Sequence, residues 1–149
     1  MARGPDLILN LFEESFAAMA QPPDTPLGRM YEEHIALLRK KDMNGILQQY
    51  AEDALLISSF TRNPQYYRGH EELTTHFKGL FDVIVGLTSD IAFWAETDNP
   101  QTLMIVEAVV LQFPDGEQKM RFADSWVLRD GKIAIHFAGM VQYPDGSLA

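Results

Sequence analysis

Asp124 is an acidic residue whose neighbours at alternate positions are large and apolar. Residues 121 to 133, RFADSWVLRDGKI, alternate like a β-strand, with Phe122, Trp126 and Leu128 on the face that carries Asp124. A carboxyl group among apolar side chains loses hydration, which disfavours its charged form and raises its pKa. Such a carboxyl can give or take a proton near neutral pH. The pattern predicts an acid or base in a pocket, although a buried structural contact would produce the same pattern.

His136 is the histidine best placed to work with Asp124, across an Asp-Gly turn. If RDG forms a three-residue loop, Asp124 lies opposite His136. With a two-residue loop the register slips by one and His136 moves to the other face of the sheet. We favour the longer loop, which predicts a carboxylate–imidazole dyad in which the histidine moves a proton.

A second turn, residues 114 to 116, decides whether Glu107 also faces the pocket. Proline suits the first central position of a type I turn, which would pair Val106 with Asp124 and turn Glu107 outward. A two-residue loop would instead bring Glu107 across from Asp124 as a second carboxyl. The proline favours the outward position. The outward face would then carry four aliphatic residues, which predicts a homodimer through the sheet: Leu103, Ile105, Val109 and Leu111.

The other histidines differ in their surroundings. His34 lies on a helical stripe with Met30 and Leu38, so it faces either the core or a ligand. His70 follows a glycine at a helix start and His76 lies off the apolar stripe of its helix, so neither is expected in the pocket. Neither an HxH nor an HExxH motif is present, and we predict no metal.

The composition is that of an acidic chain of one-domain size. It has 149 residues, of which 46% are hydrophobic, a net charge of −9 and no cysteine. Nucleic acids and anionic membranes are bound first through cationic side chains, so neither is an expected partner. Polar residues interrupt the apolar run of residues 7 to 16, and no segment approaches the roughly 20 apolar residues of a membrane span. We expect a cytoplasmic protein.

The order of the predicted elements is typical of the α+β class. Residues 5 to 20 are predicted to form a first helix. Residues 21 to 26 read as a stiff proline-rich connector and not as a domain boundary, so we expect residues 1 to 149 to make a single domain. The remaining elements are helices at about 26 to 41, 42 to 50 and 69 to 84, and strands at about 54 to 60, 63 to 67, 89 to 96, 102 to 113, 117 to 129 and 132 to 142.

Three segments in this order resemble the SnoaL-like family of the nuclear-transport-factor-2-like superfamily: YAEDALLIS, YRGHEELTTHF and ADSWVLRDGKI. Ketosteroid isomerases and polyketide cyclases belong to this superfamily. The resemblance covers about residues 27 to 142. It implies a cone-shaped, curved, mixed and mainly antiparallel sheet that wraps around about three helices and encloses an apolar pocket.

The resemblance also implies roles for particular residues. Asp124 falls on the acid/base position of the cyclases, and His34 falls where the isomerases carry a tyrosine that donates to an oxyanion. Tyr50 matches a supporting tyrosine. The isomerase general base is replaced here by Ser58, which cannot remove a proton from carbon, so steroid isomerisation by the familiar route is not expected.

The residue pattern and the resemblance together predict a cofactor-independent enzyme that acts on a hydrophobic cyclic or polyketide-like small molecule by acid/base proton transfer. Its reaction would be isomerisation, cyclisation or dehydration. The catalytic residues would be Asp124, His136 and His34. Residues expected to contact the substrate are Tyr50, Trp126, Phe122, Met140, Trp94 and Ser58. The alternative is a non-catalytic module of the same fold that binds a small molecule or dimerises.

Overall fold

The computed structural model describes residues 21 to 149, so the helix predicted at residues 5 to 20 lies outside the described residues. The helices are α2 (Pro26–Lys40), α3 (Met43–Gln49) and α4 (Gly69–Val83). The strands are β1 (Tyr50–Ser58), β2 (Gln65–Arg68), β3 (Gly86–Asp98), β4 (Gln101–Phe113), β5 (Gly116–Arg129) and β6 (Lys132–Gln142). No helix within residues 21 to 149 is long and apolar enough to cross a bilayer.

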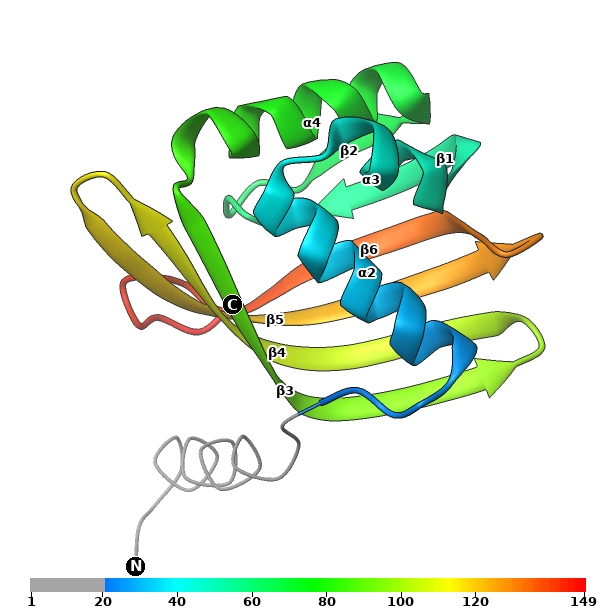
Figure 1. Ribbon diagram of the computed structural model, residues 1–149. Coiled ribbons are helices and arrows are strands. Elements are labelled where there is room, and N and C mark those ends of the chain that lie inside the picture. The colour runs from blue at the N-terminus through cyan, green and yellow to red at the C-terminus, as the bar shows by residue number, and fades with distance from the viewer. Residues whose placement is uncertain (1–20) are drawn as a thin grey trace, which may run out of the picture.

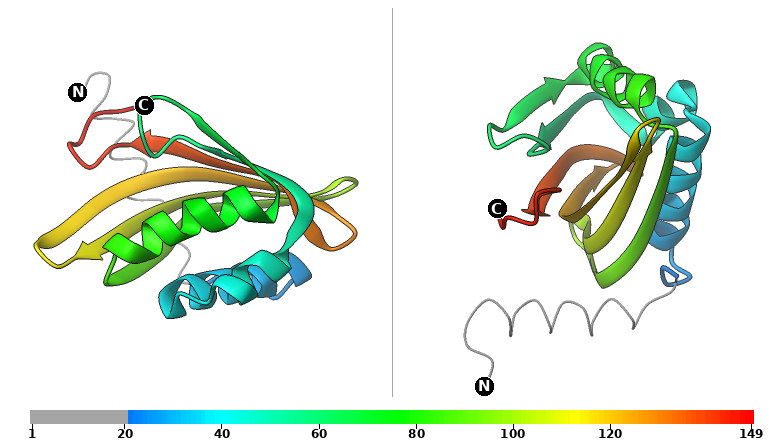
Figure 2. Two further views of the ribbon diagram at one scale, coloured as in Figure 1. Left: turned by 90° about the horizontal axis from the view of Figure 1, so that it is seen from above. Right: turned by 90° about the vertical axis from the view of Figure 1, so that its left-hand side faces the viewer.

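One curved sheet holds the strands in the order β2-β1-β6-β5-β4-β3. The pairing of β1 with β6 is parallel and every other described pairing is antiparallel. The three helices lie on the concave side of the sheet, with α2 crossing the long strands and α4 above them (Figures 1 and 2). The predicted α+β class and mixed, mainly antiparallel sheet are confirmed.

Polar side chains and a left-handed residue fix the ends of the first two helices. The Thr25 hydroxyl accepts a hydrogen bond from the Gly28 amide at the start of α2, and Lys41, with φ of 56°, ends that helix. The Asp42 carboxylate then caps α3 by accepting from the Gly45 amide.

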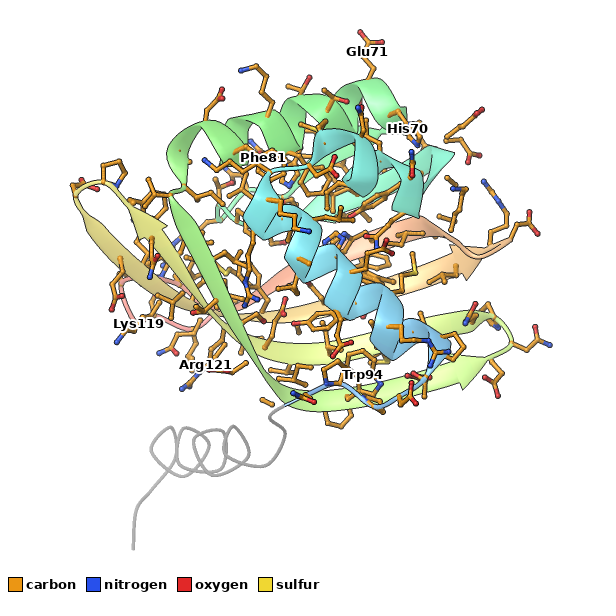
Figure 3. All side chains as sticks on the ribbon, viewed as in Figure 1. His70, Glu71, Phe81, Trp94, Lys119 and Arg121 are labelled. Carbon is orange, nitrogen blue, oxygen red and sulfur yellow. The ribbon has the colours of Figure 1, made fainter. Side chains whose placement is uncertain are left out.

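The helices bury one face each against the sheet. The inward residues of α2 include Leu27, Tyr31, His34 and Leu38, which recur at helical spacing. In α4, Phe81 points from the helix towards the sheet, whereas Glu71 points away from the molecule (Figure 3). The core therefore lies between the helices and the concave face.

The β5–β6 turn corrects the predicted register. It is a two-residue turn, because Arg129 pairs with Lys132, and Asp130 and Gly131 both have positive φ, as a type I′ turn requires. The predicted three-residue loop is therefore wrong. His136 nevertheless faces inward. The pairing skips residue 134 of β6, and this one extra residue returns His136 to the concave face. His136 lies opposite Trp126 rather than opposite Asp124.

The β4–β5 turn also differs from the prediction. Phe113 pairs with Gly116, which places Ile105 across from Asp124 and Glu107 across from Phe122. Glu107 therefore faces inward and is only 5% exposed. The aliphatic residues that alternate with it are buried as well, and burying each contributes roughly 1.5–3 kcal/mol. The free energy gained by burying these side chains exceeds the cost of keeping the Glu107 carboxyl neutral, which is roughly 1.4 kcal/mol for each unit that its pKa rises.

This register turns inward the four aliphatic residues of β4 from which a dimer was predicted. The four residues expected on the outer face are buried in the core: Leu103, Ile105, Val109 and Leu111. Large apolar side chains on the sheet that are exposed in the described chain include Phe93, Met104 and Phe137. A homodimer through the sheet remains a prediction, and these three residues would lie in its interface.

Gly28, in the first turn of α2, has no room for a side chain. A Cβ atom there would overlap the Pro23 carbonyl oxygen, whereas a Cβ atom at Gly79 of α4 would meet nothing within 4 Å. We expect Gly28→Ala to lower the free energy of unfolding by about 1–3 kcal/mol because the backbone must move. Gly79→Ala should raise it by about 0.5–1 kcal/mol. Urea unfolding of both variants measures the difference, and equal effects would contradict this packing.

Candidate functional site

A cavity opens between α2, α4 and the concave face of the sheet. Its empty volume is about 660 Å³, counting the part that opens to solvent. Most of its wall is aliphatic or aromatic, as is usual for small-molecule sites. The polar lining residues are Tyr31, His34, His76, Ser89, Glu107, Asp124 and His136, and none of the described residues that line it is Lys or Arg.

Asp124 extends into this cavity from the middle of β5. Its side chain is 14% exposed, and its Oδ1 atom is buried with no hydrogen-bond partner among the described residues. The Oδ2 atom lies 3.6 Å from Nε2 of His136, which is too long for a hydrogen bond. Burial raises the pKa of Asp124 to about 7. The group can therefore exchange a proton near neutral pH.

Glu107 is a second carboxyl in the same cavity. The Tyr31 hydroxyl donates to its Oε2 atom at 2.5 Å, and the Ser89 hydroxyl donates to the same atom at 2.6 Å. Burial, and then the charge of Asp124, raise the pKa of Glu107 to about 8, although both hydroxyl donors favour the carboxylate. Because each carboxyl affects the other, the two titrate as a pair and not as independent groups.

His136 lies beside this pair on β6. Its Nδ1 atom is 2.7 Å from the Tyr50 hydroxyl oxygen, and its Nε2 atom is buried without a hydrogen-bond partner in the described chain. Burial lowers the pKa of His136 to about 4, so the imidazole is neutral at pH 7. The predicted direct dyad is therefore an approach of 3.6 Å to Asp124 without a hydrogen bond.

His34 reaches the cavity from α2. Its Nδ1 atom is 2.8 Å from Oε1 of Gln49, and its ring packs edge-on against Trp126 with centroids 5.0 Å apart. Burial, and then the charge of His136, lower the pKa of His34 to about 3. Two neutral imidazoles thus face two carboxyl groups of raised pKa.

In the described part of the chain, no group of three or more His, Cys, Asp or Glu side chains is arranged to hold a metal ion.

The structure brings five of the residues predicted for the site to the cavity wall: His34, Phe122, Asp124, Trp126 and His136. Four others lie outside the lining. The hydroxyl oxygen of Tyr50 lies 2.7 Å from Nδ1 of His136, and Trp94 packs edge-on against Tyr31 at 5.5 Å between ring centroids. Met140 belongs to a neighbouring core cluster, and Ser58 is buried, with its hydroxyl accepting a hydrogen bond from the Phe60 amide.

His76 is a lining residue that we expected to lie away from the pocket. Its ring stacks on Phe60 with centroids 5.7 Å apart and approaches Tyr67 to 4.7 Å. The cavity reaches beyond the apolar stripe of α4, because the loop after β1 and the edge strand β2 pack against the next face of that helix. Burial lowers the pKa of His76 to about 4. His70, by contrast, donates to the Tyr50 carbonyl at 3.0 Å and does not line the cavity.

Tyr31, Ser89 and Glu107 were also missed as site residues. Tyr31 lies one helical turn before His34 on the buried stripe of α2, a spacing that could have identified it. Glu107 alternates with apolar residues along β4, which is the same signal that identified Asp124. Ser89 lies on β3 and carries no comparable signal in the sequence.

Residues 31–136 match the family model described as a SnoaL-like domain. The chain belongs to the SnoaL-like family. The curved sheet, the helices on its concave side and the cavity of this SnoaL-like domain agree with the nuclear-transport-factor-2-like fold of its structural relatives. No curated protein sequence matches the chain.

Three solved structures are similar to this SnoaL-like domain. TerC, co-crystallised with polyporic acid, is 17% identical with a TM-score of 0.63, over 78% of this chain and 92% of TerC. A LEH-like epoxide hydrolase from Mycobacterium tuberculosis is 15% identical with a TM-score of 0.61, over 77% and 83%. Rv0760c from Mycobacterium tuberculosis, in complex with estradiol-17beta-hemisuccinate, is 15% identical with a TM-score of 0.65, over 77% and 93%. Likeness at these identities shows a shared fold and leaves the reaction open.

Proposed function

We propose that this SnoaL-like protein is a cofactor-independent enzyme that moves a proton on a hydrophobic cyclic or polyketide-like small molecule, by isomerisation, cyclisation or dehydration. The observation that carries the proposal is the placement of Asp124 and Glu107 in one largely apolar cavity. Neither carboxyl forms an ion pair with a Lys or Arg of the described chain. Two acids in a largely apolar cavity that had no functional role would only destabilise the fold.

The pair supplies both partners of a proton transfer. Near neutral pH the two carboxyls share about one proton, because removing it would leave two buried negative charges in a largely apolar cavity. In the proposed reaction the ionised carboxyl removes a proton from carbon. The protonated carboxyl donates a hydrogen bond to the oxygen where negative charge develops, and the proton then returns to a second position. Asp124, with an unpartnered oxygen, is the acid/base.

The surrounding residues hold the substrate and tune the pair. His136, approaching Asp124 at 3.6 Å, can stabilise its carboxylate. Trp126 and Phe122 form apolar walls, which suit a cyclic substrate. Two structural relatives contain a bound hydrophobic compound, polyporic acid in TerC and an estradiol derivative in Rv0760c, and this supports the ligand class. Homodimer formation and a cytoplasmic location are part of the same proposal.

Deuterium exchange tests this function without knowledge of the natural substrate. The protein is incubated in D₂O with hydrophobic cyclic ketones, including 1-tetralone, and deuterium uptake next to the carbonyl is followed by mass spectrometry. An enzyme of this class should accelerate uptake over the buffer rate, because proton removal from carbon is its first step. Binding of the ketones by calorimetry without faster uptake would contradict the enzyme and favour the alternative, a non-catalytic binding module.

A further inference from the structure

Two consecutive residues at the junction of α3 and β1 each contact one cavity imidazole. Oε1 of Gln49 lies 2.8 Å from Nδ1 of His34, and the hydroxyl oxygen of Tyr50 lies 2.7 Å from Nδ1 of His136. The two imidazole centroids are 6.3 Å apart. Both rings thus face the cavity with Nδ1 already engaged, so the partner of each Nδ1 decides what each Nε2 can do.

The hydrogen bonds of Gln49 determine the tautomer of His34. The amide nitrogen of Gln49 donates to the Met30 carbonyl and to a carboxylate oxygen of Glu33, both at 3.1 Å. These two atoms only accept hydrogen bonds, so they fix which end of the amide faces His34. The oxygen end faces Nδ1 and can only accept. His34 therefore carries its proton on Nδ1, and its Nε2 is a bare acceptor.

Tyr50 sets the opposite tautomer in His136. The Tyr50 side chain is fully enclosed, and the partner of its hydroxyl among the described residues is Nδ1 of His136. If Nδ1 donated, the buried phenolic proton would have no acceptor, which costs about 1–3 kcal/mol. The phenol therefore donates, and His136 carries its proton on Nε2, the atom 3.6 Å from Oδ2 of Asp124.

We propose that Gln49 is a positioning residue and that the cavity selects a ligand with a hydroxyl group, as in an alcohol, phenol or enol, which donates its proton to Nε2 of His34. A ketone or ether oxygen offers no proton to this acceptor. The assignment replaces the donor role that the resemblance implied for His34. The tautomers follow from the hydrogen bonds alone. The ligand class rests on one part of the proposed function, the binding of a small molecule in this cavity, and not on its catalysis.

Nitrogen-15 NMR tests the tautomers directly. Long-range correlation spectra of the labelled protein at neutral pH should show His34 protonated on Nδ1 and His136 protonated on Nε2. Gln49→Leu should move the His34 proton towards Nε2, because the acceptor at Nδ1 is lost. The same substitution at the exposed neighbour, Gln48→Leu, should change neither ring. A wild-type spectrum with His34 protonated on Nε2 would overturn the assignment.

A matched pair of ligands tests the hydroxyl preference. By calorimetry, 2-naphthol should bind the wild-type protein about 3- to 10-fold more tightly than 2-methoxynaphthalene, the range of one neutral hydrogen bond. The preference should disappear in Gln49→Leu and persist in Gln48→Leu. Equal affinities, or no binding of either compound, would overturn the hydroxyl ligand. If the preference holds while no ketone exchanges deuterium, the proposed enzyme fails and this inference survives.

Discussion

Asp124→Asn should reduce the rate of proton transfer to bound ketones by about 10²- to 10⁴-fold, the usual contribution of a general acid or base. The amide has nearly the shape of the carboxyl but cannot exchange a proton at neutral pH. The fold should persist, because the amide occupies the same space and the substitution removes a buried ionisable group. Deuterium uptake and thermal melting, measured on the same sample, separate activity from stability.

The matched control is Asp90→Asn on β3, where the same chemical change occurs at an exposed carboxyl outside the cavity. Its uptake rate should equal that of the wild type. If Asp124→Asn retained the wild-type rate, Asp124 would not be the acid/base. If Asp124→Asn failed to fold while Asp90→Asn melted normally, Asp124 would be structural.

The second large effect concerns stability, which should fall as the pH rises from about 6.5 to about 8.5. In an unfolded chain Asp and Glu have pKa values of about 4, whereas in the folded protein burial raises the pKa of Asp124 to about 7 and that of Glu107 to about 8. The folded protein therefore binds protons that the unfolded chain has lost. This contribution is complete below about pH 4 and is lost as the pH passes through the folded pKa values.

The buried histidines act in the opposite direction and over a different range. Burial lowers the pKa values of His34, His76 and His136 to about 3, 4 and 4, so their contribution is present above about pH 6.5 and lost as the pH falls. Between pH 6.5 and about 7.5 the histidines of the unfolded chain still release protons and offset part of the fall, and above about pH 7.5 the carboxyls dominate. Their titration should lower the free energy of unfolding by about 2 kcal/mol by pH 8.5.

Urea unfolding at several pH values measures this loss. In the variant Glu107→Gln the fall should shrink, because one of the two titrating groups is gone and the charge that raises the pKa of the other is removed. Asp90→Asn again serves as the control and should leave the full fall unchanged. A wild-type midpoint that stays constant from pH 6.5 to 8.5 would show that neither carboxyl titrates in this range.

The long elements of the fold could be predicted because their periodicity is strong. The helix from Pro26 follows a helical stripe, and the two Asp-Gly pairs mark the ends of long strands. Register was harder to predict, because it depends on turn geometry and on bulges. The bulge at residue 134 restores His136 to the concave face. The sequence of the turn contains no residue that predicts this bulge.

The candidate site could be predicted where one strand carried its own signal. Asp124 was found because it interrupts an apolar face. Glu107 interrupts the inward face of β4 in the same way, but the proline of the turn favours a register in which Glu107 would face outward. Ser89 and His76 could not be found, because their place in the cavity depends on how distant elements pack together.

Asp124 and Glu107 are expected to share a proton in a largely apolar cavity near neutral pH. Carbon-13 NMR titration of the side-chain carboxyl carbons tests it most directly, with Asp124→Asn and Glu107→Gln used to assign the signals. We expect two coupled transitions with midpoints near pH 7 and 8. Midpoints below about pH 5 for both groups, as in exposed carboxyls, would contradict it.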